Sequence, residues 1–208
     1  MVYLKFKRLI DLILSFLGLV ILLPFLLIIV IAIKVDSKGP VLFTQKRVGK
    51  NKTHFNILKF RTMSVDTPKD KPTHLLENPE QYITMLGKFL RKTSLDELPQ
   101  IWNIFIGHMS IIGPRPALWN QYDLIAERDK YGANDVYPGL TGWAQINGRD
   151  ELPIEVKAKL DGEYVQNISF RLDVICFLKT IIRVIKHDGV IEGGTGVLDK
   201  NFKEPTSL

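Results

Sequence analysis

The feature that most constrains this chain is an apolar segment near its start, which carries no charged residue from Leu12 to Ile33. A helix rises about 1.5 Å per residue, so a segment of this length just crosses the roughly 30 Å hydrocarbon core of a bilayer. A helix that spans the membrane is therefore the simplest interpretation. A cleaved signal peptide has a similar outline, but this apolar run is too long and no small-residue cleavage site follows it.

Two further features of the segment favour a helix that enters the membrane, bends and returns. Basic residues flank it on both sides, and positive charge holds both flanks in the cytoplasm. These residues are Lys5, Lys7, Arg8, Lys34 and Lys38. Pro24 removes a backbone donor and clashes with the preceding turn, so it marks a natural apex, with arms of about ten residues that reach only mid-bilayer. Because spanning helices also tolerate proline, the residues alone leave both interpretations open.

The rest of the chain has the composition of one globular domain. The protein has 208 residues, of which 24% are charged, and its net charge of +6 favours an anionic partner such as nucleic acid, acidic lipid headgroups or a phosphorylated substrate. We expect no nucleic-acid partner, because the Lys and Arg residues are scattered and form no long basic arm. A single cysteine, Cys176, excludes an intramolecular disulfide and suits a reducing cytosol.

Local patterns predict an α+β fold that is mainly helical. Apolar runs over 41–44 and 55–60, joined by the polar residues 49–53, predict a small β-hairpin. Helices are predicted from near residue 81, after residue 94, and over 117–131 and 171–187, and loops are predicted over 64–79 and 137–149.

The predicted helix over 171–187 is amphipathic and basic. Its apolar stripe is Leu172, Ile175, Leu178, Ile181, Ile182 and Ile185, and the basic residues off that stripe are Arg171, Lys179, Arg183 and Lys186. The pattern is common in helices that pack on a core and expose the other face to solvent. Beside a membrane anchor it also suits the headgroup region, and we expect this helix to contact headgroups.

The densest polar cluster runs from Arg91 to Pro99 and contains the adjacent carboxylates Asp96 and Glu97. Ser94 and Glu97 have the spacing of a capping box, so the simplest interpretation is a helix cap. Pro99 disturbs that register, and the helix then begins later than Ser94 or is kinked. A functional interpretation is compatible with the cap: Asp96 attacks a phosphorus atom while Glu97 handles a metal ion or a proton.

A carboxylate that attacks a diphosphate needs positive charge nearby. The candidate cations are Lys59, Arg61, Arg91, Arg115 and Arg149. Arg115 stands between two prolines, which restrict its backbone and limit the directions in which its guanidinium can point. Each arginine alone also suits a surface ion pair, and the segment 138–143 also suits a tight loop, so neither motif decides the function by itself.

Taken in order along the chain, these motifs resemble the bacterial sugar transferase family. They are Lys7-Arg8 with the apolar segment that contains Pro24, KFRTM at 59–63, LDELPQ at 95–100, MSIIGPRP at 109–116, PGLTGWAQINGR at 138–149, and Leu160-Asp161 followed by Tyr164. The resemblance covers nearly the whole chain and is to the small monotopic phosphoglycosyl transferases. We accordingly divide the chain into a re-entrant membrane helix with basic flanks, 1–38, and a cytoplasmic-face catalytic domain, 39–208.

The resemblance implies a fold with a re-entrant N-terminal helix hairpin, a β-hairpin, and amphipathic interfacial helices around a cytosolic catalytic core. It implies transfer of a sugar 1-phosphate from a UDP-sugar to undecaprenyl phosphate, with UMP released and a phosphosugar carried on Asp96. Glu97 is the partner of Asp96, and both carboxylates are the implied ligands of a Mg²⁺ cofactor. The implied pocket for the diphosphate, the metal and the lipid phosphate consists of Lys59, Arg91, Arg115, Arg149 and Asp161, with Arg61 as a further candidate clamp.

The resemblance also implies a location and partners. The expected location is the cytoplasmic face of the bacterial inner membrane, with anionic phospholipids as partners and downstream glycosyltransferases of capsule, O-antigen or glycoprotein assembly as further ones. A serine often precedes the apex proline in the family, and here that position is Leu23, so the bend lacks a hydroxyl bond. Residues 114–125 are similar to capsule-type members, which makes UDP-linked 2-acetamido-6-deoxy sugars the first candidate donors.

Two other functions stay open from the sequence. One is a membrane-anchored scaffold whose basic face recruits lipids or nucleic acid and which would not need Asp96 and Glu97. The other is a transferase that moves only the sugar and releases UDP.

Overall fold

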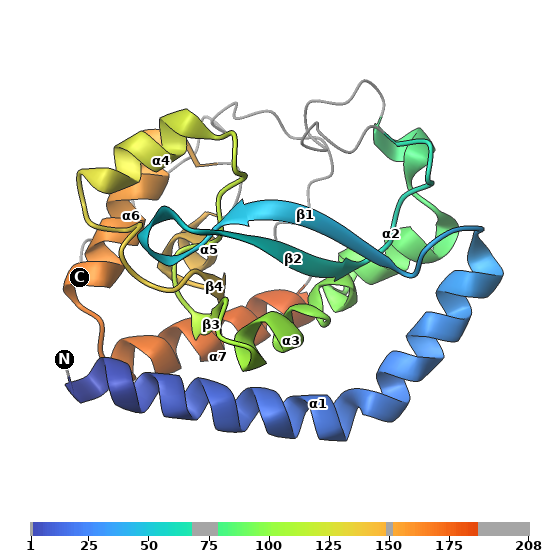
Figure 1. Cartoon of the computed structure of the whole chain (residues 1–208), viewed down its shortest axis with the longest axis horizontal. Coiled ribbons are helices and arrows are strands. Elements are labelled where there is room, and N and C mark those ends of the chain that lie inside the picture. Colours follow the sequence, from blue (N-terminus) through green and yellow to red (C-terminus); the bar gives the residue numbers. More distant parts are fainter. Residues whose placement is uncertain (1, 68–78, 149–151, 187–208) are drawn as a thin grey trace.

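The computed structural model describes residues 2–67, 79–148 and 152–186, so most of the predicted loop over 64–79 lies outside the described residues. The fold is mixed and mainly helical, as the sequence predicts. Figure 1 shows a body of short helices and two small sheets, with one long helix, α1 (Val2–Asp36), along its edge.

Helix α1 contains Pro24 and continues on both sides of it as one bent helix, so the helix hairpin that the sequence predicts is not confirmed. Proline removes one backbone hydrogen bond and kinks a helix, but the bonds before and after it keep the two arms continuous. In Figure 1 the first arm runs beneath the body and the second rises toward α2 (Met85–Lys92). By length and composition α1 could cross a membrane.

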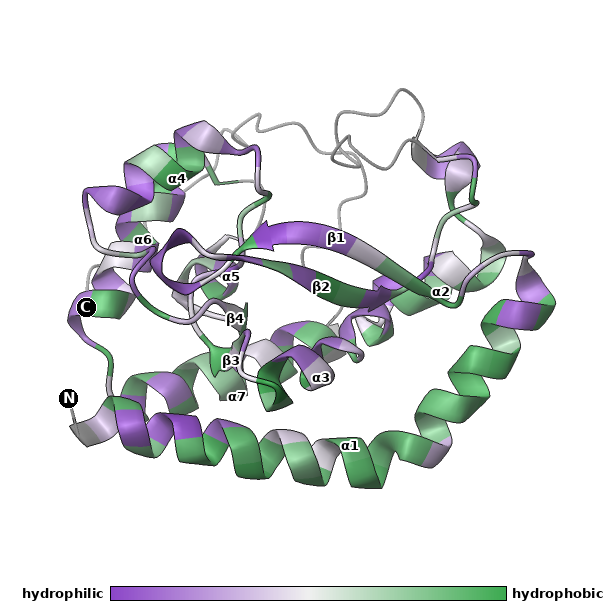
Figure 2. Ribbon diagram, in the orientation of Figure 1, coloured by the Kyte–Doolittle hydropathy of each residue, from purple (hydrophilic) through white to green (hydrophobic). Residues whose placement is uncertain are grey.

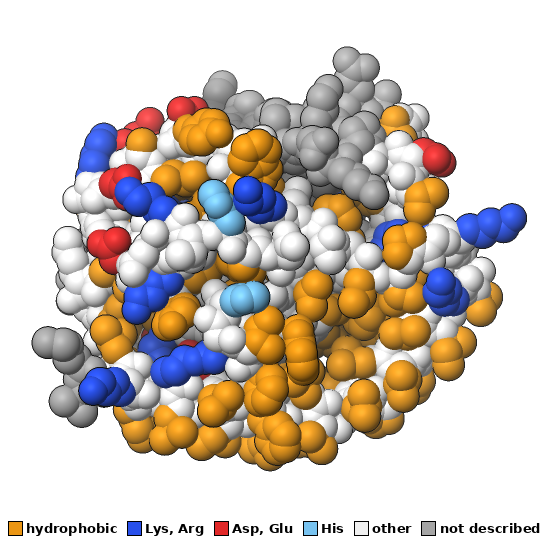
Figure 3. All heavy atoms as spheres, viewed as in Figure 1, with side chains coloured by type: hydrophobic (Ala, Val, Ile, Leu, Met, Phe, Trp, Pro, Cys, Tyr) orange, Lys and Arg blue, Asp and Glu red, His pale blue; other side chains and the backbone are white. Residues whose placement is uncertain are grey.

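Most apolar side chains of α1 are exposed, and Figure 2 shows hydrophobic ribbon along most of the helix, with hydrophilic turns near its two ends. In Figure 3 hydrophobic side chains gather along its course at the lower edge of the molecule. Helix α7 (Phe170–Lys186) divides its predicted stripe, since Leu172 is buried while Leu178 and Ile182 are exposed. Exposed apolar surfaces of this extent mark a membrane or a partner protein. Contact of α7 with headgroups stays a prediction.

The predicted hairpin is confirmed. Strand β1 (Leu42–Val48) pairs antiparallel with β2 (His54–Phe60), and Leu42 lies opposite Phe60. The turn uses two left-handed residues, Asn51 and Lys52, with φ of 52° and 59°. One face of the hairpin packs through Phe55 and Ile57 against the body, so the hairpin is fixed where β2 approaches the carboxylate pair.

The sequence did not predict a second sheet, in which β3 (Ser110–Ile112) pairs parallel with β4 (Gly139–Thr141). Strand β4 and helix α5 (Trp143–Asn147) lie in the predicted loop over 137–149. Strands this short carry no periodic signal. Glycine is required by the close backbones, because a Cβ on Gly142 would lie 2.0 Å from the Gly113 carbonyl oxygen.

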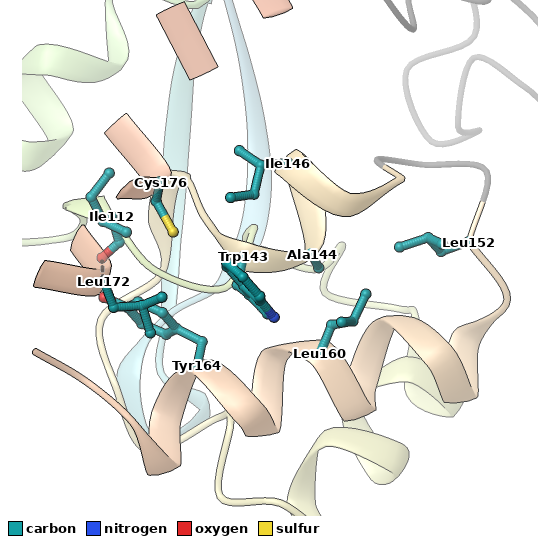
Figure 4. Packing of buried hydrophobic residues seen from close by; sticks show 9 residues of the cluster. All are labelled: Ile112, Trp143, Ala144, Ile146, Leu152, Leu160, Tyr164, Leu172 and Cys176. Atoms are coloured by element: carbon teal, nitrogen blue, oxygen red, sulfur yellow. Dashed lines mark hydrogen bonds between the residues drawn. The ribbon is translucent and has the colours of Figure 1, made fainter. Parts of the chain in front are cut away.

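Two helices complete the body: α4 (Tyr122–Asp129) lies inside the predicted range 117–131, and α6 (Ile154–Gln166) was not predicted. Figure 4 shows the core where α5, α6 and α7 meet, with Trp143, Tyr164, Leu172 and Cys176 packed together. The Tyr164 hydroxyl lies 3.2 Å from the carbonyl oxygen of Ile112, at the end of β3. This core therefore fixes the strand that leads directly to Arg115.

Candidate active site

Asp96 and Glu97 lie in a short 3₁₀ helix, Leu95–Glu97, between α2 and α3 (Gln100–Phe105). Ser94 enters it with a left-handed φ of 56° and makes no side-chain capping bond, so the predicted capping box is wrong. The delayed helix start expected from Pro99 is confirmed, because α3 begins at the next residue. A capping box needs the cap in an extended conformation, which a left-handed residue cannot supply.

The apolar side of this turn faces α1. Leu95 and Leu98 pack against a buried cluster that includes Ile29 and Ile33 from the second arm of α1. Because these leucines fasten the turn on that side, the carboxylates are presented toward β2 and the segment after β3. The sequence thus places its two acidic residues between two apolar anchors.

Glu97 is held by two cations. Its Oε1 accepts a hydrogen bond from Lys59 Nζ at 2.7 Å and another from Arg115 Nη2 at 2.8 Å. Burial opposes ionisation of this group, but Arg115 and Lys59 outweigh it and hold the pKa of Glu97 well below its usual range. Glu97 therefore stays ionised and fixes both cations in place.

The pKa of Asp96 is shifted in the opposite direction from that of Glu97. Burial, aided by the negative charge of Glu97, raises the pKa of Asp96 to about 6 against the pull of nearby cations. Among the described residues no hydrogen bond reaches its carboxylate, whereas Glu97 receives two. At pH 7 a group of this pKa is mostly ionised, and an ionised carboxylate without hydrogen-bond donors is suited to attack an electrophile.

Arg91 approaches the cluster from the last turn of α2. Its Nε donates to Thr62 Oγ1 at 2.8 Å, and its charge lowers the pKa of Asp96. Helix α2 lies so close to the backbone at Thr62, just after β2, that a Cβ on Gly87 would stand 2.1 Å from the Thr62 carbonyl oxygen. The glycine allows the approach that places Arg91 beside the carboxylates.

Three of the predicted pocket residues therefore meet at the carboxylates: Lys59, Arg91 and Arg115. Arg149 lies outside the described residues, and its predicted role stays a prediction.

The structure does not bring Arg61 to the carboxylate pair, and its role as a phosphate clamp stays a prediction. Its guanidinium is buried and donates to three backbone carbonyls, those of Ser37, Lys38 and Pro40. Those bonds fasten the chain where it leaves α1. Three of the five guanidinium N–H donors are thus committed to backbone carbonyls of the segment that follows α1.

Asp161 is likewise not brought to the carboxylate pair. It is fully buried on α6, and its Oδ2 accepts hydrogen bonds from Arg128 Nε at 2.8 Å and Nη2 at 2.6 Å. A buried carboxylate needs such a partner, because an unpaired charge is costly away from water. In the structure Asp161 thus joins α6 to α4, and its predicted pocket role stays a prediction.

The basic pair before the apolar segment faces the body. Lys7 Nζ lies 2.6 Å from Asp173 Oδ2 on α7, and Arg8 donates to carbonyls at the end of α3, including that of Ile104 at 2.8 Å. The sequence predicted these side chains only as a cytoplasmic flank. In the structure they fasten the first arm of α1 to the domain.

Sequence reasoning missed the polar contacts that surround this attachment. Tyr164 donates to Asp173 at 2.7 Å, and its burial there raises the pKa of Tyr164. Asp11 is also buried, against β3. The available signal was Asp11 itself, because an ionisable residue at the start of a membrane segment usually has a specific partner.

The carboxylates offer a limited metal site. Within 2–67, 79–148 and 152–186 no group of three or more His, Cys, Asp or Glu side chains could hold a metal ion. Mg²⁺ is commonly held by one or two carboxylates together with substrate phosphates and water. Asp96 and Glu97 therefore fit a magnesium ion that binds with a diphosphate, and they do not form a site that holds one alone.

The sequence matches the family described as bacterial sugar transferase over residues 2–187. An undecaprenyl-phosphate glucose phosphotransferase of Komagataeibacter xylinus is 40% identical over 191 residues, 86% of this chain and 36% of that protein. An uncharacterized sugar transferase of Bacillus subtilis, EpsL, is 38% identical over 184 residues, 88% of this chain and 89% of that protein. A UDP-N-acetylgalactosamine-undecaprenyl-phosphate N-acetylgalactosaminephosphotransferase of Aeromonas hydrophila is 34% identical over 190 residues, 88% of this chain and 44% of that protein. The chain thus spans less than half the length of the first and third relatives.

Proposed function

The chain belongs to the bacterial sugar transferase family, and from this premise we propose that it transfers a sugar 1-phosphate from a UDP-sugar to undecaprenyl phosphate, with release of UMP. The observation that carries the proposal is the pair of unlike carboxylates. Glu97 is locked to Lys59 and Arg115, while Asp96 beside it accepts no hydrogen bond from the described residues. Relatives named for undecaprenyl-phosphate sugar phosphotransfer support the substrate classes.

In the proposed first step an Asp96 carboxylate oxygen attacks the β-phosphorus of the UDP-sugar. The bond to the oxygen bridging the two phosphates breaks, and UMP leaves with that oxygen. In the second step an oxygen of the lipid phosphate attacks the same phosphorus, which releases Asp96 and yields undecaprenyl diphosphosugar. A covalent intermediate of this kind lets two phosphorylated substrates use one pocket in turn.

The cations around Asp96 have the task of offsetting phosphate charge. Lys59, Arg91 and Arg115 all lower the pKa of Asp96, so their field reaches the attacking oxygen. We assign Glu97 the role of aligning Lys59 and Arg115, since its low pKa argues against a proton-accepting role. Mg²⁺ bound with the diphosphate would neutralise further negative charge there.

We also propose that α1 is re-entrant, with both ends at the cytoplasmic face. Contacts at both ends support this. The first arm is fastened by Lys7 to Asp173, and the second arm ends where the Asp36 carboxylate accepts a hydrogen bond from the Leu86 amide at 3.4 Å. Binding of both ends to one domain supports a location of both ends on the same face of the bilayer.

Thiol labelling tests this topology. In a Cys176→Ser background, Val2→Cys and Lys38→Cys should both resist a membrane-impermeant reagent in intact cells and react after permeabilisation. Labelling of Val2→Cys alone in intact cells would establish a spanning helix.

Product analysis tests the reaction. The purified protein, undecaprenyl phosphate and Mg²⁺ are incubated with a panel of UDP-sugars that includes 2-acetamido-6-deoxy sugars, glucose and N-acetylgalactosamine. We expect UMP from at least one donor, and no UMP from Asp96→Asn. Asp123→Asn, which removes an exposed carboxylate on α4, is the matched control and should turn over normally. UDP as the product would indicate sugar transfer, and a folded protein without turnover on any donor would favour the scaffold.

A further inference from the structure

Among the described residues, strand β3 has a neighbouring strand on one side only. The Ser110 amide donates to the Pro138 carbonyl, on the side of β4. The Ile111 amide points to the other edge, as alternation along a strand requires. An unpaired amide of this kind in the interior is costly, so the open edge of β3 needs an acceptor.

Asp11 of α1 supplies that acceptor. Its Oδ1 accepts from the Ile111 amide at 3.0 Å, and its Oδ2 accepts from Ser110 Oγ at 2.7 Å. The side chain is only 4% exposed. The Asp11 carboxylate thus supplies the acceptor that a neighbouring strand would otherwise provide. It does so from α1, a helix whose other side chains are mostly apolar and exposed. Packing alone would not require a buried charge at this position.

The strand held by Asp11 runs straight into the active site. Beyond Ile112 the chain continues through Gly113 and Pro114 to Arg115, whose guanidinium binds Glu97 at 2.8 Å. Proline restricts the backbone there, so a shift of β3 is passed to Arg115 and not absorbed by a flexible loop. Displacements of about 1 Å in such groups can cost about a hundredfold in rate.

We propose that Asp11 is a positioning residue for the transfer reaction: by closing the free edge of β3 it fixes Arg115 on Glu97. The inference rests on the proposed function, because it concerns the same site. It also gives the first arm of α1 a role in the chemistry beyond attachment to the membrane.

The test is Asp11→Asn, which keeps the shape but replaces one of the two acceptor oxygens with an amide donor. We expect kcat to fall about tenfold while KM for the UDP-sugar stays within about threefold, since Asp11 is buried against β3 and is bonded to Ser110 and Ile111. Ser15→Ala is the matched control. Ser15 is equally buried on the same helix, but within the described part of the chain its hydroxyl bonds only to the Leu12 carbonyl, so both constants should be unchanged.

A double-mutant cycle with Arg115→Lys separates positioning from general loss of structure. If Asp11 acts through Arg115, adding Asp11→Asn to Arg115→Lys should lower kcat by less than about threefold more. Losses that multiply in full would overturn the proposal, as would a wild-type kcat for folded Asp11→Asn.

Ser110→Ala gives a milder test in case Asp11→Asn does not fold. It removes only the hydroxyl bond to Asp11, so kcat should fall in the same direction by a smaller factor, and an unchanged kcat would then overturn the positioning role. Wild-type protein is the reference in every assay. A wild type that releases no UMP would refute the proposed function and this inference with it, whereas an active wild type with an equally active Asp11→Asn would refute only the inference.

Discussion

Glu97 and Asp161 are both carboxylates bound by an arginine, yet the two regions around them differ. The Asp161 side chain is 1% exposed and that of Arg128 is 4% exposed, and they form a pair of one anion and one cation. The Glu97 side chain is 20% exposed and binds Arg115 and Lys59 together. A second carboxylate, Asp96, stands beside it with a raised pKa.

The difference shows how a structural ion pair can be told from a reactive one. The Arg128–Asp161 pair is closed to solvent, and its two hydrogen bonds through Oδ2 commit the two side chains to each other. At Glu97 the cations hold one carboxylate ionised while burial and that same negative charge raise the pKa of its neighbour. Two titratable groups with pKa values moved in opposite directions are typical of a reactive site.

The largest effect on stability is expected at the closed pair. Asp161→Ala leaves Arg128 buried without its partner, which should destabilise the protein by about 3–5 kcal/mol. Thermal unfolding in detergent, followed by circular dichroism, measures this. The double variant Asp161→Leu with Arg128→Met should recover most of the loss. If Asp161→Ala instead unfolds like wild type but loses turnover, Asp161 belongs to the reactive site after all.

Removal of the Asp96 carboxylate is expected to change stability in the opposite direction. The pKa of Asp96 is about 6 in the folded protein, above its usual value, so folding disfavours the ionised form. Relative to Asp96→Asn, wild type should lose stability as the pH rises from about 4 to about 6, and at pH 7 the variant should be more stable by about 1–3 kcal/mol. Melting temperatures at pH 5 and pH 8 measure this. A variant less stable than wild type at pH 8 would contradict the assigned electrostatics.

A smaller effect is expected when a cation is changed but its charge is kept. Arg115→Lys should lower turnover at least about tenfold, or about 1.4 kcal/mol, because lysine loses the planar fork of the guanidinium. We expect the same of Arg149→Lys from the sequence. Arg171→Lys, on the exposed surface of α7, is the control and should leave UMP release unchanged. Normal turnover by both Arg115→Lys and Arg149→Lys would show that these arginines are structural.

The smallest effect on stability and turnover is expected at an ion pair that is exposed to solvent and lies away from Asp96. Lys52 and Asp129 pair at 3.1 Å with side chains that are 53% and 44% exposed. Lys52→Ala should change stability by less than about 0.5 kcal/mol and should leave turnover unchanged. A loss comparable with that of Arg115→Lys would mean that overall positive charge, and not the arrangement at Glu97, determines activity.

The sequence predicted the parts of this molecule that are encoded locally. The hairpin at 42–60 follows from two short apolar runs around a polar turn. Asp96 and Glu97 are adjacent in the chain. Lys and Arg side chains are the expected partners of two carboxylates that act on a diphosphate. The sequence therefore indicates Lys59 and Arg115 as partners of the carboxylates, and both bind Glu97 in the structure.

The parts that could not be predicted depend on partners far away in the chain. Asp11 and Ser110 are separated by 99 positions, and neither residue indicates the other. The charges of Arg61 and Asp161 suit a phosphate pocket. Charge alone does not reveal that Arg61 donates to backbone carbonyls or that Asp161 is bound by Arg128. Strands β3 and β4 are too short for periodicity and are defined only by their pairing.

The central claim is that Asp96 carries the phosphosugar. Wild-type protein incubated with its UDP-sugar and Mg²⁺, but without undecaprenyl phosphate, should release about one UMP per active site and then stop. Mass spectrometry of the digested protein should place the added phosphosugar on the peptide that contains Asp96, and Asp96→Asn should show neither the burst nor the adduct. Near-normal turnover by a verified Asp96→Asn protein would contradict the account and leave direct attack by the lipid phosphate in its place.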